Sequence, residues 1–153
     1  MIAPTIEAFG AGLRIVGARP DAAREGALAF EPWSEAAEVS LIQTFDIGIM
    51  PLTDTPWARG KCGYKLIQYM ACGLPVIASP VGVNSDIVEH GVNGFLADTE
   101  EEWAQAISTL LSDRELRHRM GAAGRKKVEA EYSLQVWGPK VAAMIRDVAE
   151  GAA

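Results

Sequence analysis

The residues with the clearest chemical potential lie in one short stretch, from Gly60 to Gln68. The stretch starts as a loop with two glycines and two lysines, Lys61 and Lys65, and then takes on the pattern of a short helix. The N-terminus of a helix presents free backbone N–H groups and the positive end of the helix dipole, and both favour an anion such as a phosphate. The spacing therefore predicts an anion-binding site where this helix begins.

Each residue of this stretch also has a simpler interpretation. The two lysines could serve only solubility, but cations at a helix N-terminus oppose the dipole by about 0.3 kcal/mol or more, and a bound anion would offset that cost. We therefore favour the binding role. Gly60 and Gly63 permit a tight turn and would equally let a ligand approach the backbone. Gln68, on the polar face of the helix, could contact a ribose hydroxyl or water.

Other reactive side chains carry weaker signals. We expect Cys62 and Cys72 to be small apolar packing residues, because no histidine is placed by the sequence to activate either thiol. Trp57 could stack on a base or sugar, or could pack as a loop anchor. The cysteines and histidines do not have the spacing of a zinc site, so we expect no bound metal.

The composition limits the possible classes of protein. The 153 residues are enough for one domain with a hydrophobic core. A formal net charge of −6 argues against nucleic acid as a partner, since nucleic acid requires a basic surface. Two cysteines and no long apolar run predict a reduced, cytosolic setting, with the chain soluble or at most peripheral to a membrane.

The periodicity predicts the elements that must position the anion site. Short apolar runs that alternate with helical patterns predict a parallel α/β sheet. We expect the strands at residues 13–17, 27–31, 46–50, 75–78 and 94–97. Ligands of such sheets bind beyond the carboxyl ends of the strands, so the loops after Phe30, Met50 and Ala78 should converge.

Polar residues before the helical patterns predict where helices begin. Ser34 is expected as an N-cap, and Thr99 with Glu102 and Ser112 with Glu115 as capping boxes. The segment from Leu52 to Gly60 is expected to be a loop. Ser133 should cap a last helix, in which Pro139 predicts a kink or a late start.

Four consecutive blocks of the sequence together resemble one known family. They are Phe45–Leu52, Lys65–Ser79, Gly82–Val88 and Gly91–Leu96. In this order they resemble the C-terminal, donor-binding half of retaining GT-B glycosyltransferases, which belong to the glycosyl transferases group 1 family. The resemblance implies a Rossmann-like parallel sheet with helices on both faces and a C-terminal helical tail.

The resemblance also implies a set of site residues. Members of the family commonly carry two glutamates eight positions apart, which contact the donor sugar and the ribose and which align here with Gly60 and Gln68. Gln68 can still bond ribose hydroxyls, whereas Gly60 cannot replace a carboxylate. The resemblance implies no obligatory metal and identifies no catalytic residue. The implied donor-binding residues are Gly60, Lys61, Cys62, Gly63, Tyr64, Lys65, Gln68, Leu52 and Trp33.

The resemblance further implies an incomplete enzyme. We expect residues 1–132 to form an N-terminally truncated nucleotide-sugar-binding domain, and residues 133–153 a helix that crosses to a missing N-terminal, acceptor-binding domain. The isolated chain should then be inactive and prone to self-association, and the complete enzyme should lie in the cytoplasm or on the inner face of the membrane. Two alternatives stay open: a non-catalytic nucleotide-binding or assembly module, and half of another GT-B enzyme such as a sugar-nucleotide epimerase.

Overall fold

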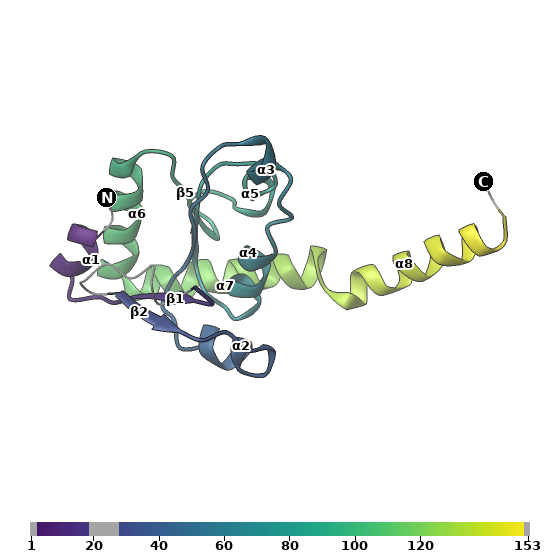
Figure 1. Cartoon of the computed structure of the whole chain (residues 1–153), viewed down its shortest axis with the longest axis horizontal. Coiled ribbons are helices and arrows are strands. Elements are labelled where there is room, and N and C mark those ends of the chain that lie inside the picture. Colours follow the sequence, from purple (N-terminus) through teal and green to yellow (C-terminus); the bar gives the residue numbers. More distant parts are fainter. Residues whose placement is uncertain (1–2, 19–27, 152–153) are drawn as a thin grey trace.

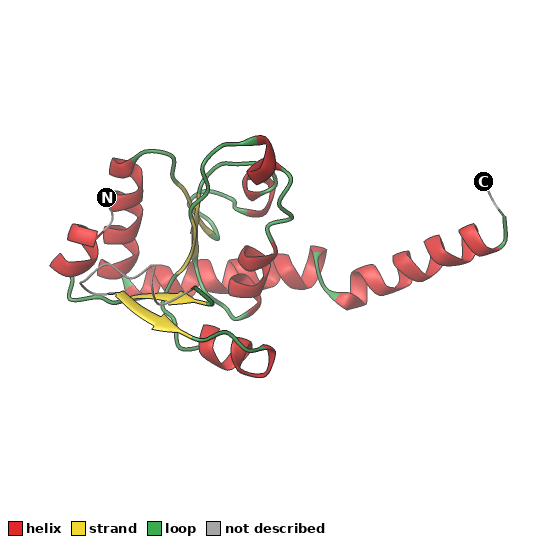
Figure 2. Cartoon of the chain, in the orientation of Figure 1, coloured by secondary structure: helices red, strands yellow, loops and turns green. Residues whose placement is uncertain are grey.

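The computed structural model describes residues 3–18 and 28–151, which fold as strands and helices that mostly alternate (Figures 1 and 2). The predicted α/β class is confirmed, and every predicted strand is present, although Ala27 lies outside the described residues. The elements are α1 (Ala3–Ala8), β1 (Leu13–Val16), β2 (Leu28–Glu31), α2 (Glu35–Ile42), β3 (Gly48–Met50), α3 (Pro56–Arg59), α4 (Tyr64–Ala71), β4 (Val76–Ala78), α5 (Asn84–Ile87), β5 (Gly94–Leu96), α6 (Glu100–Ser112), α7 (Arg114–Glu131) and α8 (Leu134–Ala149).

The strands form two parallel sheets, which differs from the single sheet that the sequence predicts. In one sheet β1 pairs with β2, with Leu13 opposite Leu28. The other has the order β3-β4-β5, with Ile49 opposite Ile77 and Ile77 opposite Phe95. Within the described residues, no ladder joins β1 to β3, because a hollow separates the two edges.

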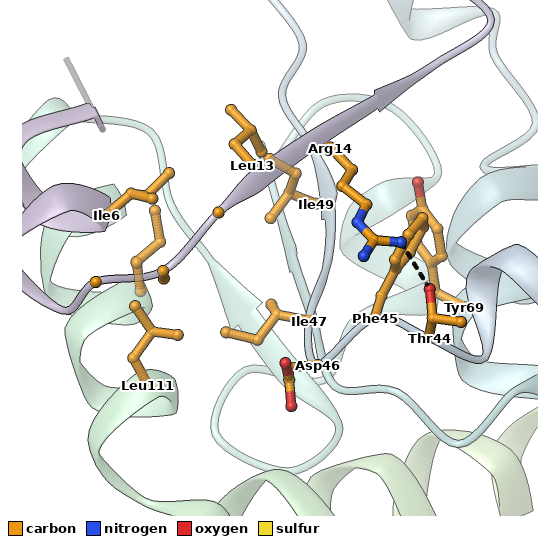
Figure 3. Close-up of a pocket in the computed structure, with 14 residues that line it drawn as sticks. Ile6, Leu13, Arg14, Thr44, Phe45, Asp46, Ile47, Ile49, Tyr69 and Leu111 are labelled. Carbon is orange, nitrogen blue, oxygen red and sulfur yellow. Dashed lines mark hydrogen bonds between the residues drawn. The ribbon is translucent and has the colours of Figure 1, made fainter. Parts of the chain in front are cut away.

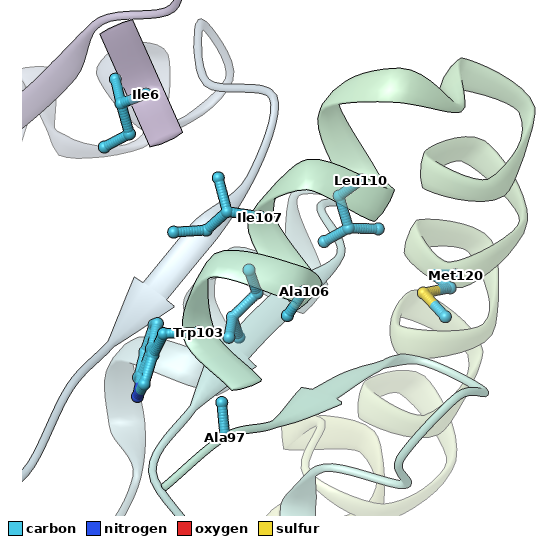
Figure 4. Close-up of a cluster of buried hydrophobic side chains, with 8 residues drawn as sticks. Ile6, Ala97, Trp103, Ala106, Ile107, Leu110 and Met120 are labelled. Carbon is cyan, nitrogen blue, oxygen red and sulfur yellow. The ribbon is translucent and has the colours of Figure 1, made fainter. Parts of the chain in front are cut away.

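The three-stranded sheet is covered on both faces. Ile77 of β4 belongs to a buried cluster with Trp103, Ile107 and Leu110 of α6 and with Ile6 of α1 (Figure 4). Its neighbours Val76 and Ala78 point the other way, into a second cluster built around Leu66 and Met70 of α4. Successive strand residues face opposite sides of a sheet, so this alternation places α1 and α6 on one face and α4 on the other.

The last two helices differ in how they pack. Helix α7 contributes Met120 to the first cluster and Val128 to the second. It lies so close to the turn after α4 that a Cβ on Gly121 would overlap the carbonyl oxygen of Gly73. Helix α8, by contrast, runs away from the rest of the molecule and buries none of its residues (Figure 1). None of the helices in the described ranges is long and apolar enough to cross a membrane.

Several helix ends correct the sequence predictions. The capping box of Thr99 and Glu102 is confirmed, and Ser34 caps α2 through its side chain. The predicted box at Ser112 is wrong, because Asp113 caps α7 and the Ser112 hydroxyl donates to Ser108 inside α6.

The loop predicted before Gly60 contains the short helix α3, which is capped by Thr55. Ser133 precedes α8 without a side-chain cap, and its hydroxyl donates to the carbonyl of Glu129 instead. Helix α8 begins at Leu134 and continues through Pro139, so the predicted late start is wrong.

Candidate functional site

The predicted anion site lies where α4 begins, beyond the carboxyl ends of β3 and β4. Gly63 is the N-cap residue of α4 and has a φ of 66°, in the left-handed region that favours glycine. A Cβ on Gly63 would also overlap the Cδ1 atom of Ile87 in α5. Both the turn and the packing therefore require a glycine at position 63. This supports the predicted role of Gly63 in a tight turn.

The first backbone N–H groups of this turn are left without protein acceptors. The N–H of Leu66 donates to the carbonyl of Gly63, which begins the helical pattern. In the described part of the chain, no acceptor pairs with the N–H groups of Cys62, Gly63, Tyr64 and Lys65. Unpaired N–H groups at a helix start form a concentrated set of donors for a negatively charged oxygen.

The loops around this turn are fixed by close contacts. A Cβ on Gly82 would lie 2.6 Å from the carbonyl oxygen of Arg59, so the loop after β4 packs directly against the end of α3. The N–H of Leu52 donates to the hydroxyl of Ser79 at 3.0 Å, which ties the loop after β3 to the loop after β4. The Arg59 guanidinium makes two hydrogen bonds to the Asp54 carboxylate, at 2.6 and 2.8 Å.

A carboxylate that sequence reasoning missed stands at the centre of the polar side chains. Glu38 of α2 accepts from Lys65 Nζ at 2.5 Å and from Gln68 Nε2 at 2.7 Å. The indole N–H of Trp33 donates to the same carboxylate at 2.9 Å. The Lys65 ammonium also donates to the Gln68 amide oxygen at 2.9 Å. The structure thus brings Trp33, Lys65 and Gln68 together, but around Glu38.

The partners of Glu38 control its ionisation. The hydrogen bonds from Lys65, Trp33 and Gln68, in that order of size, lower the pKa of the Glu38 carboxyl from 4.5 to about 2. Its side chain is only 17% exposed, whereas that of Lys65 is 48% exposed. Glu38 is therefore ionised near neutral pH and holds Lys65 and Gln68 in fixed positions.

The other predicted residues are more open to solvent. Lys61, Cys62 and Tyr64 are exposed, and Lys61 makes no ion pair with any described residue. The packing role predicted for Cys62 is therefore wrong. Cys72 is half-buried, and burial raises the pKa of its thiol, which fits the predicted packing role. Gly60 ends α3 with a φ of −81°.

Two aromatic side chains lie near the site. Trp57 on α3 is 83% exposed, so its predicted alternative as a packed loop anchor is wrong. Trp33 lines a hollow of about 290 Å³ together with Val16, Glu38 and Lys65. Lys65 connects this hollow to the start of α4, because its side chain lines the hollow and its backbone N–H is one of the groups with no described acceptor. Such an arrangement suits a ligand that has both an anionic group and a flat ring.

The chain matches one known family over most of its length. The family model of the glycosyl transferases group 1 matches residues 33–127, well over half of the chain. The chain belongs to this family. The matched residues include Trp33, Glu38 and the whole turn from Gly60 to Gln68.

The chain is similar in sequence to several curated proteins, two of which are described here. The chain is 36% identical over 71 residues to spore coat protein SA of Bacillus subtilis, an alignment that covers 44% of this chain and 19% of the relative. It is 34% identical over 86 residues to a GDP-mannose-dependent phosphatidylinositol monomannoside mannosyltransferase of Mycobacterium tuberculosis, covering 55% and 22%. The chain thus matches only about a fifth of the length of these relatives.

Solved structures show the same fold. A structure of HepE from Anabaena in complex with UDP and glucose superposes with a TM-score of 0.69, at 23% identity, over 80% of this chain and 32% of that chain. Sucrose-phosphate synthase from Thermosynechococcus elongatus gives a TM-score of 0.75 at 22% identity, over 96% and 42%. The fold is that of one half of a GT-B glycosyltransferase.

Proposed function

We propose that the chain is the donor-binding half of a glycosyltransferase that transfers a sugar from a nucleotide-diphospho-sugar to an acceptor. The observation that carries this proposal is the row of N–H groups at the start of α4 that have no acceptor among the described residues, close in sequence to Lys61, which makes no ion pair with a described residue. Membership of the glycosyl transferases group 1 family supports it. We also propose transfer with retention, which rests on the family resemblance alone.

The proposed binding mode uses each part of the site for one group of the ligand. The diphosphate would accept from the N–H groups of Gly63, Tyr64 and Lys65 and would pair with Lys61. The ribose would bond to Gln68 and Glu38, whose carboxylate lies 2.7 Å from the Gln68 amide nitrogen. The base would lie in the hollow lined by Trp33, with Leu52 on the neighbouring loop.

This arrangement stabilises a leaving group more directly than it performs acid–base chemistry. Fixed N–H donors and the helix dipole favour the negative charge that develops on a departing nucleotide diphosphate. Exposed Lys61 would add a positive charge that no described carboxylate neutralises. No residue of the described site is assigned as a general base, and the isolated chain is proposed to be inactive because no acceptor site is assigned among the described residues.

We propose that α8 contacts an acceptor-binding domain. One side of this helix carries Trp137, Val141, Met144, Ile145 and Val148, and each is at least 43% exposed. Their spacing places them on one apolar stripe. Without that domain the stripe is proposed to drive self-association. The free thiols of Cys62 and Cys72 support the cytoplasm as the compartment, with or without contact to the membrane's inner face.

Isothermal titration of the full chain with UDP and with GDP tests the donor site. We expect measurable binding of at least one nucleotide. Lys61→Ala should weaken it by about tenfold, since a charge-assisted hydrogen bond contributes about 1.5 kcal/mol or more. Gln68→Ala should weaken it by about fivefold, since a neutral hydrogen bond contributes about 1 kcal/mol.

Lys126→Ala is the matched control, because Lys126 is an exposed lysine of α7 with no described ion pair. It should bind like the parent chain. An absence of heat with both nucleotides, in a chain that unfolds cooperatively, would contradict the proposed function. Equal weakening by all three variants would point to a non-specific charge effect and would also contradict the assigned site.

A further inference from the structure

The Glu38 carboxylate accepts from three side-chain donors, and this limits how it can receive a ligand. One of its oxygens accepts from Lys65 Nζ at 2.5 Å and from the indole N–H of Trp33 at 2.9 Å. The other oxygen accepts from Gln68 Nε2 at 2.7 Å. A carboxylate offers about four acceptor positions in all. A ribose that presents two hydroxyl groups to Glu38 therefore has to displace one of these donors.

Lys65 is the donor best able to leave. Its side chain is 48% exposed, so the ammonium can move without opening the core. A lysine ammonium is a point charge at the end of a flexible four-carbon stem, whereas the donors from Trp33 and Gln68 are neutral. Only Lys65 is therefore attracted by an approaching phosphate. Its own backbone N–H is one of the groups without a described acceptor at the start of α4, so the proposed diphosphate would lie against the same residue.

No second cation of the described chain pairs with Glu38. Arg14 lines the same hollow, but its guanidinium donates to Thr44 Oγ1 at 3.1 Å, on the side of the hollow between β1 and β3 (Figure 3). Among the described residues, the ion pair of Glu38 is with Lys65 alone. Removal of the Lys65 ammonium would leave an ionised carboxylate, 17% exposed, that has only neutral donors.

We propose that Lys65 exchanges partners when a nucleoside diphosphate binds. Its ammonium leaves Glu38 for the diphosphate, and the carboxylate then accepts from the ribose hydroxyl groups. A nucleoside without phosphates has to break the same ion pair and offers the ammonium no anion in return. Lys65 therefore selects nucleoside diphosphates against free nucleosides. The inference rests on the proposed donor site and adds to it a residue that sets specificity.

The energetics of charged contacts give the size of this selection. An ion pair that is partly open to solvent changes an equilibrium by about fivefold, which is the penalty that a free nucleoside meets at Glu38. A charge-assisted hydrogen bond to a phosphate changes affinity by about tenfold or more. The second effect exceeds the first, so the exchange favours a diphosphate even though the Lys65–Glu38 pair is lost.

The test compares the full chain with Lys65→Met, which removes the charge and keeps the apolar stem. Binding of UDP, GDP, uridine and guanosine is followed through the indole N–H signal of Trp33, which donates to Glu38. We expect Lys65→Met to weaken the diphosphate that the parent chain binds by about twofold or more and to tighten its nucleoside by about fivefold. A residue that only supported the fold would change both affinities in the same direction.

Two further variants show whether the effect passes through the proposed contact. Lys126→Met is the matched control, because Lys126 is an exposed lysine with no described ion pair, and it should bind all four ligands like the parent chain. In a Glu38→Gln background, Lys65→Met should no longer tighten the nucleoside, because no carboxylate is left to release. This double-mutant cycle isolates the coupling between the two side chains.

The outcomes separate the exchange from the donor site. If the parent chain binds UDP or GDP, weaker or unchanged nucleoside binding by Lys65→Met, including none in either chain, would overturn the exchange alone. Tightening that persists in the Glu38→Gln background would also overturn it, since the effect would not depend on Glu38. If the parent chain binds neither UDP nor GDP, the donor site and the exchange fail together.

Discussion

The three-stranded sheet and the two-stranded sheet differ in how completely they are enclosed. Val76, Ile77 and Ala78 of β4 have no exposed surface, whereas the described side chains of β1 are half-buried or exposed. The enclosed sheet fixes the start of α4 through Leu66 and Met70. The open sheet supplies Val16 to the neighbouring hollow, and the loop after β2 supplies Trp33. The start of α4 is thus supported by an enclosed core, whereas the hollow beside Trp33 is lined by a more open sheet.

The largest difference between the two sheets is expected when one isoleucine in each is truncated and the free energy of unfolding is measured. Ile77→Ala should lower the free energy of unfolding by about 2–5 kcal/mol, because it leaves a cavity in a closed cluster. Ile15→Ala should cost about 1 kcal/mol, since Ile15 is only half-buried and its surroundings can relax. Urea titration followed by circular dichroism measures both. Equal losses would contradict the contrast.

A smaller difference in stability is expected between substitutions of Gly60 and Gly63, the two glycines before α4. Gly63→Ala should destabilise the chain by about 2 kcal/mol or more, because the residue has a left-handed φ and its Cβ would overlap Ile87. Gly60→Ala should change stability by about 0.5 kcal/mol or less, because its φ is −81° and its Cβ would make an ordinary contact with Trp57.

Thermal unfolding of the two glycine variants beside the parent chain measures the difference. A Gly63→Ala chain as stable as the Gly60→Ala chain would contradict this prediction. In that case the turn would not be fixed by the enclosed sheet.

Glu38 connects the two regions compared above. It belongs to α2, which follows the two-stranded sheet, and pairs with Lys65 and Gln68 of α4, which packs on the three-stranded sheet. The folded-state pKa of Glu38 is lowered from 4.5 to about 2, mainly by Lys65. Its stabilising contribution is therefore fully present above pH 4.5 and is lost as the pH falls toward 2. The unfolding free energy of the parent should fall more steeply across this range than that of Glu38→Gln. If the unfolding free energies of the two chains change with pH in the same way, Glu38 does not stabilise the fold through Lys65 and Gln68.

Much of the fold could be predicted from the sequence because its signals are local. The fully apolar run Val76–Ala78 and the Thr99–Glu102 box each specify an element within a few residues. The sequence also contains a local signal for α3, because Thr55 and Pro56 are typical N-cap and N1 residues. The same residues are common in loops, which is why a loop is predicted there. At α7 the true cap, Asp113, lies one residue after the predicted Ser112.

The candidate site was less predictable because its decisive contacts are distant in sequence. The stretch from Gly60 to Gln68 could be identified from its glycines and lysines, and the unpaired N–H groups lie there. Glu38 could not be identified, since its bonds to Lys65 and Gln68 cross 27 and 30 residues and depend on how α2 packs near α4. The gap between β1 and β3 likewise becomes visible only when the strand order is known.

The most direct test of the central claim is a titration of the ¹⁵N-labelled full chain with UDP and with GDP, followed by amide chemical shifts. If the start of α4 holds a diphosphate, the largest shifts should come from the N–H groups of Gly63, Tyr64 and Lys65, which have no described protein acceptor. The amides of Gly10 and Gly12, at the far end of β1, should not move. Shifts concentrated at those glycines, or none anywhere with either nucleotide, would contradict the account.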